Sequence, residues 1–283
     1  MFRRNYWLAA CLLLAAGCGR GPKTANEVVA LETAEIPAGP KERVWNRAPE
    51  HRAALLAQDL VEPRLMTPST PEIAVRALTN GTEIVFRLEW TDDASDDTPG
   101  PSRMADACAV QLPEKIEPDL PEPQMGQEGR AVQIAYWRAD WQAWVNGRGG
   151  SIQDLYPNAA IDHYPFAAPP LEPGSSARQE MERLYSPALA SGNLRAGPRK
   201  SPVEALIATG PGTLDKAPEQ NADGSGVFEK NRWQVVIRRP LPQGLGRDQR
   251  THVAFAVWQG SKQESGARKM RTGWIPLVRR AGS

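Results

Sequence analysis

Residues 73–90 read IAVRALTNGTEIVFRLEW, and this stretch predicts a β-hairpin. Asn80-Gly81 lies between two apolar runs, and this dipeptide is typical of the type I′ turn that joins two antiparallel strands. In the second run every other residue is apolar, at Ile84, Phe86, Leu88 and Trp90. One face of the hairpin is therefore expected to be buried, and the other to be in contact with water.

Further strand-like segments follow along the chain, at residues 131–137, 233–239, 252–258 and 272–278. The segment 252–258 is almost entirely apolar, which predicts a central strand covered on both faces. Pro276 marks the last segment as an edge strand. Helical periodicity is weak outside residues 176–184, and irregular segments are expected at 112–129, 146–175 and 208–230. The sequence therefore predicts an all-β fold, an antiparallel β-sandwich with long loops and few short helices.

The composition is that of a soluble globular protein. Of the 283 residues, 41% are hydrophobic and 24% are charged, and the net charge is +1. No stripe of Arg and Lys is evident, so we expect no nucleic acid as a partner. Nine Trp residues on a β-sandwich would suit a carbohydrate-binding module if their side chains were exposed. We expect instead that most of the tryptophans on strands fill the core, at Trp90, Trp137, Trp233 and Trp258.

The first residues are typical of an export signal. The stretch MFRRNYW is positively charged, and the apolar run after it is too short to span a membrane. Small residues precede Cys18 in LAAGC, which resembles the lipobox of bacterial lipoproteins. We therefore expect a signal peptide over residues 1–17, a lipid-anchored polar tether over residues 18–45 and one domain over residues 46–283. The protein is then exported to the periplasm, and simple secretion without a lipid is the alternative.

Few residues are available for metal or nucleophile chemistry. After lipidation of Cys18, only Cys108 remains in the mature domain, so no disulfide is expected. The histidines have no metal-ligand spacing, at His51, His163 and His252. The acidic run at residues 91–100, TDDASDDTPG, does not fit a calcium loop and is expected to be solvated. No recognisable catalytic motif is present, so we expect no enzymatic activity of the chain itself.

Ordered blocks along the chain resemble a known family. The blocks include VRALTNGTEIVFRLEWTDD, DACAVQLP, PQMG, VQIAYWRADWQ, RWQVVIRRPL and GARKMRTGWIPL. Their order from about Trp45 to Leu277 resembles the haem b-binding γ subunits of periplasmic molybdenum enzymes of the dimethyl sulfoxide reductase superfamily. Members of that group include ethylbenzene dehydrogenase, dimethyl sulfide dehydrogenase, and selenate and chlorate reductases.

The resemblance implies one non-covalent haem b in a pocket enclosed by the loops, held between a methionine and a lysine. The methionine of the family's P-x-M-G loop corresponds to Met125, and the lysine of its G-R-K segment corresponds to Lys269. Because Ala267 interrupts that segment here, Lys262 in GSKQE is the alternative axial lysine. A lysine ligates only as the free amine, so its pKa must fall well below about 10.4. Burial and neighbouring positive charge, from Arg268 and Arg271, have that effect.

With both axial positions filled by protein, the resemblance implies electron transfer. The implied partners are a molybdopterin catalytic subunit and an iron–sulfur subunit, or a soluble c-type cytochrome. A free-standing anchored cytochrome is the second version of this interpretation. Arginines such as Arg138 or Arg232 are candidates for contact with the haem propionates. The rival interpretation is a carbohydrate- or ligand-binding β-sandwich without haem.

Overall fold

The computed structural model describes residues 26–59, 61–98, 100, 102–148, 158, 172, 174–177, 179–180 and 199–282. The expected signal peptide, Cys18 and His163 lie outside these residues. In the part of the chain that is described, we find no helix of the length and apolar character needed to cross a membrane.

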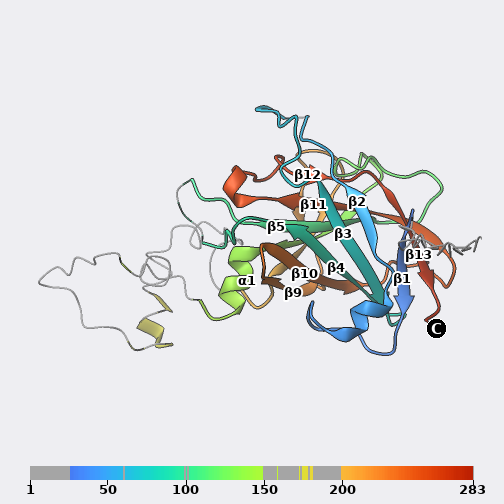
Figure 1. Ribbon diagram of the computed structural model, residues 1–283, viewed down its shortest axis with the longest axis horizontal. Coiled ribbons are helices and arrows are strands. Elements are labelled where there is room, and N and C mark those ends of the chain that lie inside the picture. Colours follow the sequence, from blue (N-terminus) through green and yellow to red (C-terminus); the bar gives the residue numbers. More distant parts are fainter. Residues whose placement is uncertain are drawn as a thin grey trace, which may run out of the picture.

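The described strands form one continuous sheet that folds into two packed layers. The first layer holds β1 (Val28–Glu32), β2 (His51–Ala54), β3 (Glu72–Thr79), β4 (Glu83–Thr91), β9 (Asp223–Phe228), β10 (Arg232–Pro240) and β13 (Ile275–Arg280). The second holds β5 (Ala107–Pro113), β6 (Val132–Arg138), β7 (Val203–Ala208), β8 (Asp215–Lys216), β11 (Arg250–Trp258) and β12 (Met270–Arg271). Strands β3, β4 and β10 run at an angle across β5 and β11 (Figure 1). The all-β sandwich is therefore confirmed.

Strand β11 joins the two layers. Its first residues pair with β13, and its residues from Ala254 to Trp258 pair with β5. The strand is buried on both faces from Val253 onward, as the apolar run predicted. The helices are short, as expected: α1 (Ala139–Val145) and the 3-10 turns η1 (Arg43–Arg47) and η2 (Gly260–Lys262). Of the segment predicted to be helical, residues 176–177 and 179–180 are helical in the described part.

The predicted hairpin is confirmed, but the predicted type I′ turn is wrong, because residues 80–83 connect the strands and Asn80 lacks the positive φ that this turn requires. Strands β3 and β4 pair antiparallel up to Thr79 and Ile84. The Asn80 side-chain oxygen accepts hydrogen bonds from the backbone N–H groups of Thr82 and Glu83, at 3.0 and 2.8 Å. Gly81 has a φ of 94°, a conformation that glycine adopts without strain. The turn thus fixes the register that sends one face of β4 into the core.

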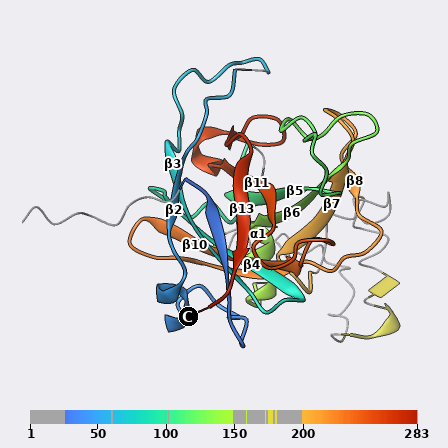
Figure 2. The same cartoon turned by 90° about the vertical axis from the view of Figure 1, so that its right-hand side faces the viewer.

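Two features of the first layer differ from the prediction. Strand β1 pairs parallel with both β13 and β3, so the sheet is mixed and not purely antiparallel. It lies within residues 18–45, where a tether was expected, and Val28 and Ala30 are buried. Pro276 was expected on an edge, but β13 lies between β11 and β1, side by side with β1 in Figure 2. The proline is tolerated because the ladder with β1 begins only at Leu277.

Strand β9 occupies part of the segment predicted to be irregular, and its glycines explain the error. A Cβ atom on Gly226 would lie 2.4 Å from the Trp137 ring, and one on Gly224 would lie 2.2 Å from a backbone oxygen of β10. The DGSG sequence reads as a turn. In the structure the absence of a side chain at Gly226 leaves room for the indole of Trp137, and its absence at Gly224 lets β9 approach the β10 backbone closely.

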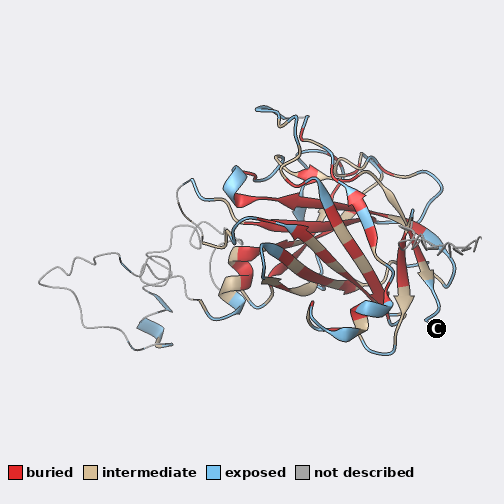
Figure 3. Ribbon diagram, viewed as in Figure 1, coloured by how far each residue is buried: buried red, intermediate tan, exposed pale blue. Residues whose placement is uncertain are grey.

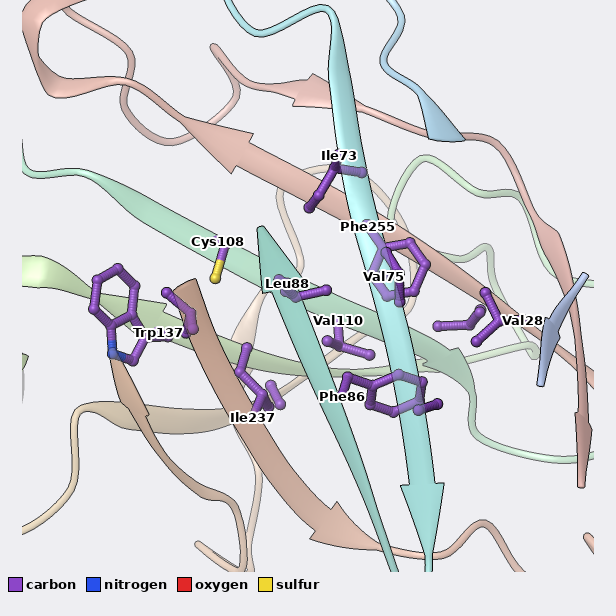
Figure 4. Packing of buried hydrophobic residues seen from close by; sticks show 14 of the residues in the cluster. Val28, Ile73, Val75, Phe86, Leu88, Cys108, Val110, Trp137, Ile237 and Phe255 are labelled. Atoms are coloured by element: carbon purple, nitrogen blue, oxygen red, sulfur yellow. The ribbon is translucent and has the colours of Figure 1, made fainter. Parts of the chain in front are cut away.

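The core lies between the two layers. Figure 4 shows Phe86, Val110, Ile237 and Phe255 pointing toward one another from both layers, and all four are 2% exposed or less. The buried colour in Figure 3 follows the strands, while much of the described part of the β2–β3 connection is exposed. Three strand tryptophans pack together in this core, with ring centroids 5.0–6.5 Å apart, as predicted: Trp90, Trp137 and Trp233.

One end of the core is closed by a buried carboxylate. Asp106 accepts hydrogen bonds from the backbone N–H groups of Gly260 and Asp96 and from the indole N–H of Trp233, at 2.7–2.9 Å. Burial, with the nearby charge of Asp92, raises the pKa of Asp106 to about 7. Asp92 itself is 1% exposed, so the prediction of a fully solvated acidic run is wrong for this residue. Asp106 instead fixes the 92–106 loop against the core.

Candidate functional site

A cavity of about 770 Å³ lies against the face of the second layer that points away from the core. Successive side chains of a strand point to opposite faces of the sheet. In β5, β6, β7 and β11, the side chains that alternate with those in the core therefore point toward this cavity. They form a separate apolar cluster, and those that line the cavity are Ala109, Ile134, Leu206, Ala256 and Trp258. These residues form the floor of the cavity, and the small alanine side chains leave room above it for a broad, flat, apolar ligand.

Four connections between strands form the walls of the cavity. The residues that they contribute are Ala57, Gln58, Asp59 and Val61 after β2, Pro123, Gln124 and Met125 after β5, Pro211, Gly212 and Leu214 after β7, and Ser265, Gly266, Ala267 and Lys269 after β11. Two of these connections lie in segments predicted to be long and irregular. Long loops in a compact domain commonly carry a binding function, and here they surround one cavity.

The loop that carries Met125 is held rigidly. The Pro121 carbonyl accepts a hydrogen bond from the Trp274 indole at 2.7 Å, and the Pro123 carbonyl accepts one from the Gln111 amide at 3.0 Å. The Met125 carbonyl accepts one from Gly210 N–H at 2.9 Å. The start of the PEPQM stretch is therefore tied to the residue before β13, its middle to β5, and its end to the loop after β7.

Met125 and the residue after it both have unusual backbone conformations. The φ angles of Met125 and Gly126 are 75° and 78°. A residue with a Cβ atom in this region stores roughly 1–3 kcal/mol of strain, and such strain is concentrated at functional sites. A Cβ atom on Gly126 would lie 2.9 Å from the Arg130 carbonyl oxygen and 3.0 Å from that of Ala208. The Met-Gly pair is thus required to turn the loop so that the thioether reaches the cavity.

Lys269 is directed to the cavity by the register of β12. Met270 and Arg271 of β12 pair with Val257 and Ala256 of β11, respectively. Met270 and Val257 are both fully buried in the core. Since side chains alternate along a strand, Lys269 and Arg271 project to the opposite face, where the cavity lies.

The two residues that the resemblance implied as ligands meet in the cavity. The Lys269 Nζ atom lies 3.8 Å from the Met125 Sδ atom, and 5.7 Å from the centre of the Trp258 ring. Burial, and then the charge of Arg271, lower the pKa of Lys269 from 10.5 to about 8. The alternative lysine, Lys262, is exposed at the end of η2 and is not among the lining residues.

Cations outnumber acids around the cavity. Its charged lining residues are Asp59, Arg138, Lys269 and Arg271. Arg138 forms a bidentate pair with Asp140 at 2.8 Å, so its charge is largely compensated. Arg232, the other arginine considered from the sequence, is half-exposed on β10 and does not line the cavity. The sequence did not distinguish Arg271 from other basic residues near Lys269.

The tryptophans do not form an exposed stacking surface. None of the eight that the structure describes is exposed, since each is buried or of intermediate exposure. Trp258 differs from the core tryptophans in lining the cavity, where its ring contacts that of Tyr136 with centroids 5.1 Å apart. Within the described residues no group of three or more His, Cys, Asp or Glu side chains is arranged to hold a metal ion.

Comparison with solved structures finds a family 9 carbohydrate-binding module from Caldicellulosiruptor kristjanssonii, in complex with cellotriose. The TM-score is 0.43 at 8% identity, over 90% of this chain and 94% of that chain. The same module in complex with glucose gives a TM-score of 0.44 at 8% identity, over 90% and 96% of the two chains. These scores are too low to carry an argument about fold or ligand.

Two curated relatives are more informative. The chain is 23% identical over 261 residues to the putative respiratory nitrate reductase heme subunit ORF7 of Haloferax mediterranei, covering 89% of this chain and 72% of that protein. It is 23% identical over 258 residues to the dimethylsulfide dehydrogenase subunit gamma of Rhodovulum sulfidophilum, covering 84% and 74%. The family described as ethylbenzene dehydrogenase matches residues 42–270, most of the chain. The protein therefore belongs to the ethylbenzene dehydrogenase family.

Proposed function

We propose that this chain is an electron-transfer protein or subunit that binds one haem b non-covalently in the cavity, with Met125 and Lys269 as axial ligands. The contact of 3.8 Å between the Lys269 amine and the Met125 sulfur carries the proposal. The two residues are 144 positions apart in the chain, and two independent loops bring them together over an apolar floor.

The donor pair fits a metal in its chemistry. The Lys269 amine and the Met125 sulfur, 3.8 Å apart, would together hold the iron of the haem. The thioether of Met125 is a soft, neutral donor that needs no deprotonation. A bound haem supplies one-electron chemistry, at a potential set by its axial ligands and its surroundings.

Lys269 is prepared to act as a neutral donor. Because the pKa of Lys269 is about 8, it lies roughly one unit above neutral pH, so little free energy is needed to remove the proton. The pKa of an exposed lysine lies more than roughly three units above neutral pH. Burial against the apolar floor disfavours the ammonium form, and Arg271 repels it. In the structure the amine donates a hydrogen bond to the Met125 sulfur, and as a free amine it would offer its lone pair to a metal held between the two side chains.

The relatives support the partner class. One is named as the heme subunit of a respiratory nitrate reductase, and the other as a subunit of dimethylsulfide dehydrogenase. We propose that this chain exchanges electrons with a molybdopterin catalytic subunit through an iron–sulfur subunit, or with a soluble c-type cytochrome. We also propose export to the periplasm and lipidation at Cys18, which mass spectrometry of the mature protein tests. Co-purification with iron–sulfur and molybdopterin subunits distinguishes a subunit from a free-standing cytochrome.

The haem assignment is tested by optical spectroscopy of the mature domain, purified with haem available. We expect a Soret band, and α and β bands that sharpen on reduction with dithionite. Replacing Met125 or Lys269 by Ala converts the low-spin spectrum to a high-spin or haem-free one. Lys262→Ala is the matched control and keeps the low-spin spectrum. A protein that stays colourless after reconstitution contradicts the proposal, and would favour a sandwich that binds a carbohydrate or another ligand.

A further inference from the structure

We infer that Arg271 binds a carboxylate of the ligand in the cavity, which for haem b is a propionate. The inference rests on the proposed function and names the group that anchors the polar edge of the ligand. Arg271 lies in β12, lines the cavity and is of intermediate exposure.

The backbone of Arg271 is fixed on both sides. It pairs with Ala256 of β11, and its carbonyl accepts a hydrogen bond from Leu56 N–H at 2.8 Å. Directly opposed residues of an antiparallel pair have their side chains on the same face. The Arg271 side chain therefore rises from the cavity floor beside Ala256, and the buried Met270 next to it prevents a change of face.

The guanidinium of Arg271 is available for a ligand. Within the described ranges it forms no side-chain hydrogen bond and no ion pair, in contrast to Arg138, which is occupied by Asp140. Among the described residues that line the cavity, Asp59 is the single acid. The cavity thus presents an uncompensated cation beside an apolar floor.

An arginine in this position matches the chemistry of a porphyrin carboxylate. The planar guanidinium binds a carboxylate through two parallel hydrogen bonds, and such charge-assisted bonds are about twice as strong as neutral ones. When the apolar ring of a ligand covers the alanine floor, its carboxylates lose water and need a charged partner. Arg271 lies two residues after the proposed axial lysine, and both residues line the cavity.

The test compares two porphyrins that differ only in charge. The apoprotein is titrated with haem b and, separately, with haem b dimethyl ester, in which both carboxylates are esterified. The Kd of each is read from the Soret band. We expect wild-type protein to prefer haem b by at least roughly tenfold, the size of one charge-assisted hydrogen bond. Arg271→Gln removes most of this preference by weakening haem b, and leaves the affinity for the ester close to that of wild type.

Two controls separate a direct contact from a general effect. Arg232→Gln, which removes a cation outside the cavity, keeps the wild-type preference, and Arg271→Lys keeps part of it because the charge remains. Uptake of the ester shows that each variant is folded around its cavity. The inference is overturned if Arg271→Gln retains the wild-type preference, or if Arg138→Gln loses more of it. A wild-type protein that takes up neither porphyrin overturns both this inference and the haem assignment.

Discussion

The glycine that follows Met125 provides the sharpest test of the loop geometry. In Gly126→Ala, the new Cβ atom meets two backbone carbonyl oxygens, of Arg130 and Ala208, at 2.9 and 3.0 Å. Both belong to the backbone that flanks or forms the second layer, so neither can move aside without disturbing the sheet. The φ of 78° adds a conformational cost, because a residue with a Cβ atom is disfavoured there.

The expected magnitude follows from these two contributions. The left-handed conformation costs about 1–2 kcal/mol for a residue with a side chain, and overpacking against a rigid neighbour costs about 1–3 kcal/mol. We therefore expect Gly126→Ala to lower the free energy of unfolding by about 2–5 kcal/mol, measured by urea denaturation. The strained turn also moves Met125, so the low-spin spectrum of the haem-loaded protein is lost.

Gly129→Ala is the matched control in the same loop. Gly129 has nearly the same φ, 76°, but no atom lies within 4 Å of its Cβ position. It therefore carries only the conformational cost of about 1–2 kcal/mol, and it leaves the spectrum unchanged. Equal destabilisation by the two substitutions would show that the Met125 loop does not pack against Ala208, and the account of how the sulfur is positioned would fail.

Three further predictions concern the core and the cavity. The pKa of Asp106 is raised to about 7 in the folded protein, so its carboxyl ionises at lower pH in the unfolded chain. The free energy of unfolding therefore falls by at most about 4 kcal/mol as the pH rises from about 4 to about 7. Urea titrations at pH 5 and 7.5 measure this change, and a rise in the free energy of unfolding would contradict the prediction. Ala256→Leu fills the cavity floor, so Soret absorbance per protein drops while the free energy of unfolding changes by less than about 1 kcal/mol. Burial lowers the pKa of Arg239 to about 10, and among the described residues its side chain hydrogen-bonds to Gln133 and has no acidic partner. Arg239→Met therefore raises the free energy of unfolding by about 1 kcal/mol, and destabilisation in the same assay would show that the guanidinium is better paired than the structure indicates.

The strands that could be predicted from the sequence are those in which large apolar side chains recur at every second position. The β3–β4 hairpin is the clearest case, since Asn80-Gly81 sets the turn and alternation sets the buried face. Strand β1 escaped prediction because five residues that pair in parallel on both sides carry no hairpin signal. Strand β9 was not predicted because Gly226 makes room for Trp137 and Gly224 for the β10 backbone, and the contact with Trp137 depends on a residue far away in the chain.

The site illustrates the same limit. Met125 and Lys269 were implied by the family resemblance, whereas local composition alone would make each an ordinary loop residue. The role inferred for Arg271 could not be predicted from the sequence, because it depends on which basic residues around the cavity already have acidic partners. That distinction separates Arg138, paired with Asp140, from Arg271, and it exists only once the chain is folded.

The Lys269-Met270-Arg271 triplet shows how Lys269 faces the cavity although Ala267 interrupts the G-R-K segment. Met270 is fully buried in the core opposite Val257, and this contact fixes the register of β12. A shift by one residue would place a lysine or an arginine in the core, at a cost far above that of rearranging an exposed turn. Extra residues between Gly266 and Met270 are therefore absorbed by the exposed turn, and the residues on either side of the methionine still face the cavity. The alternation around Met270 thus places one side chain in the core and directs its two neighbours toward the cavity.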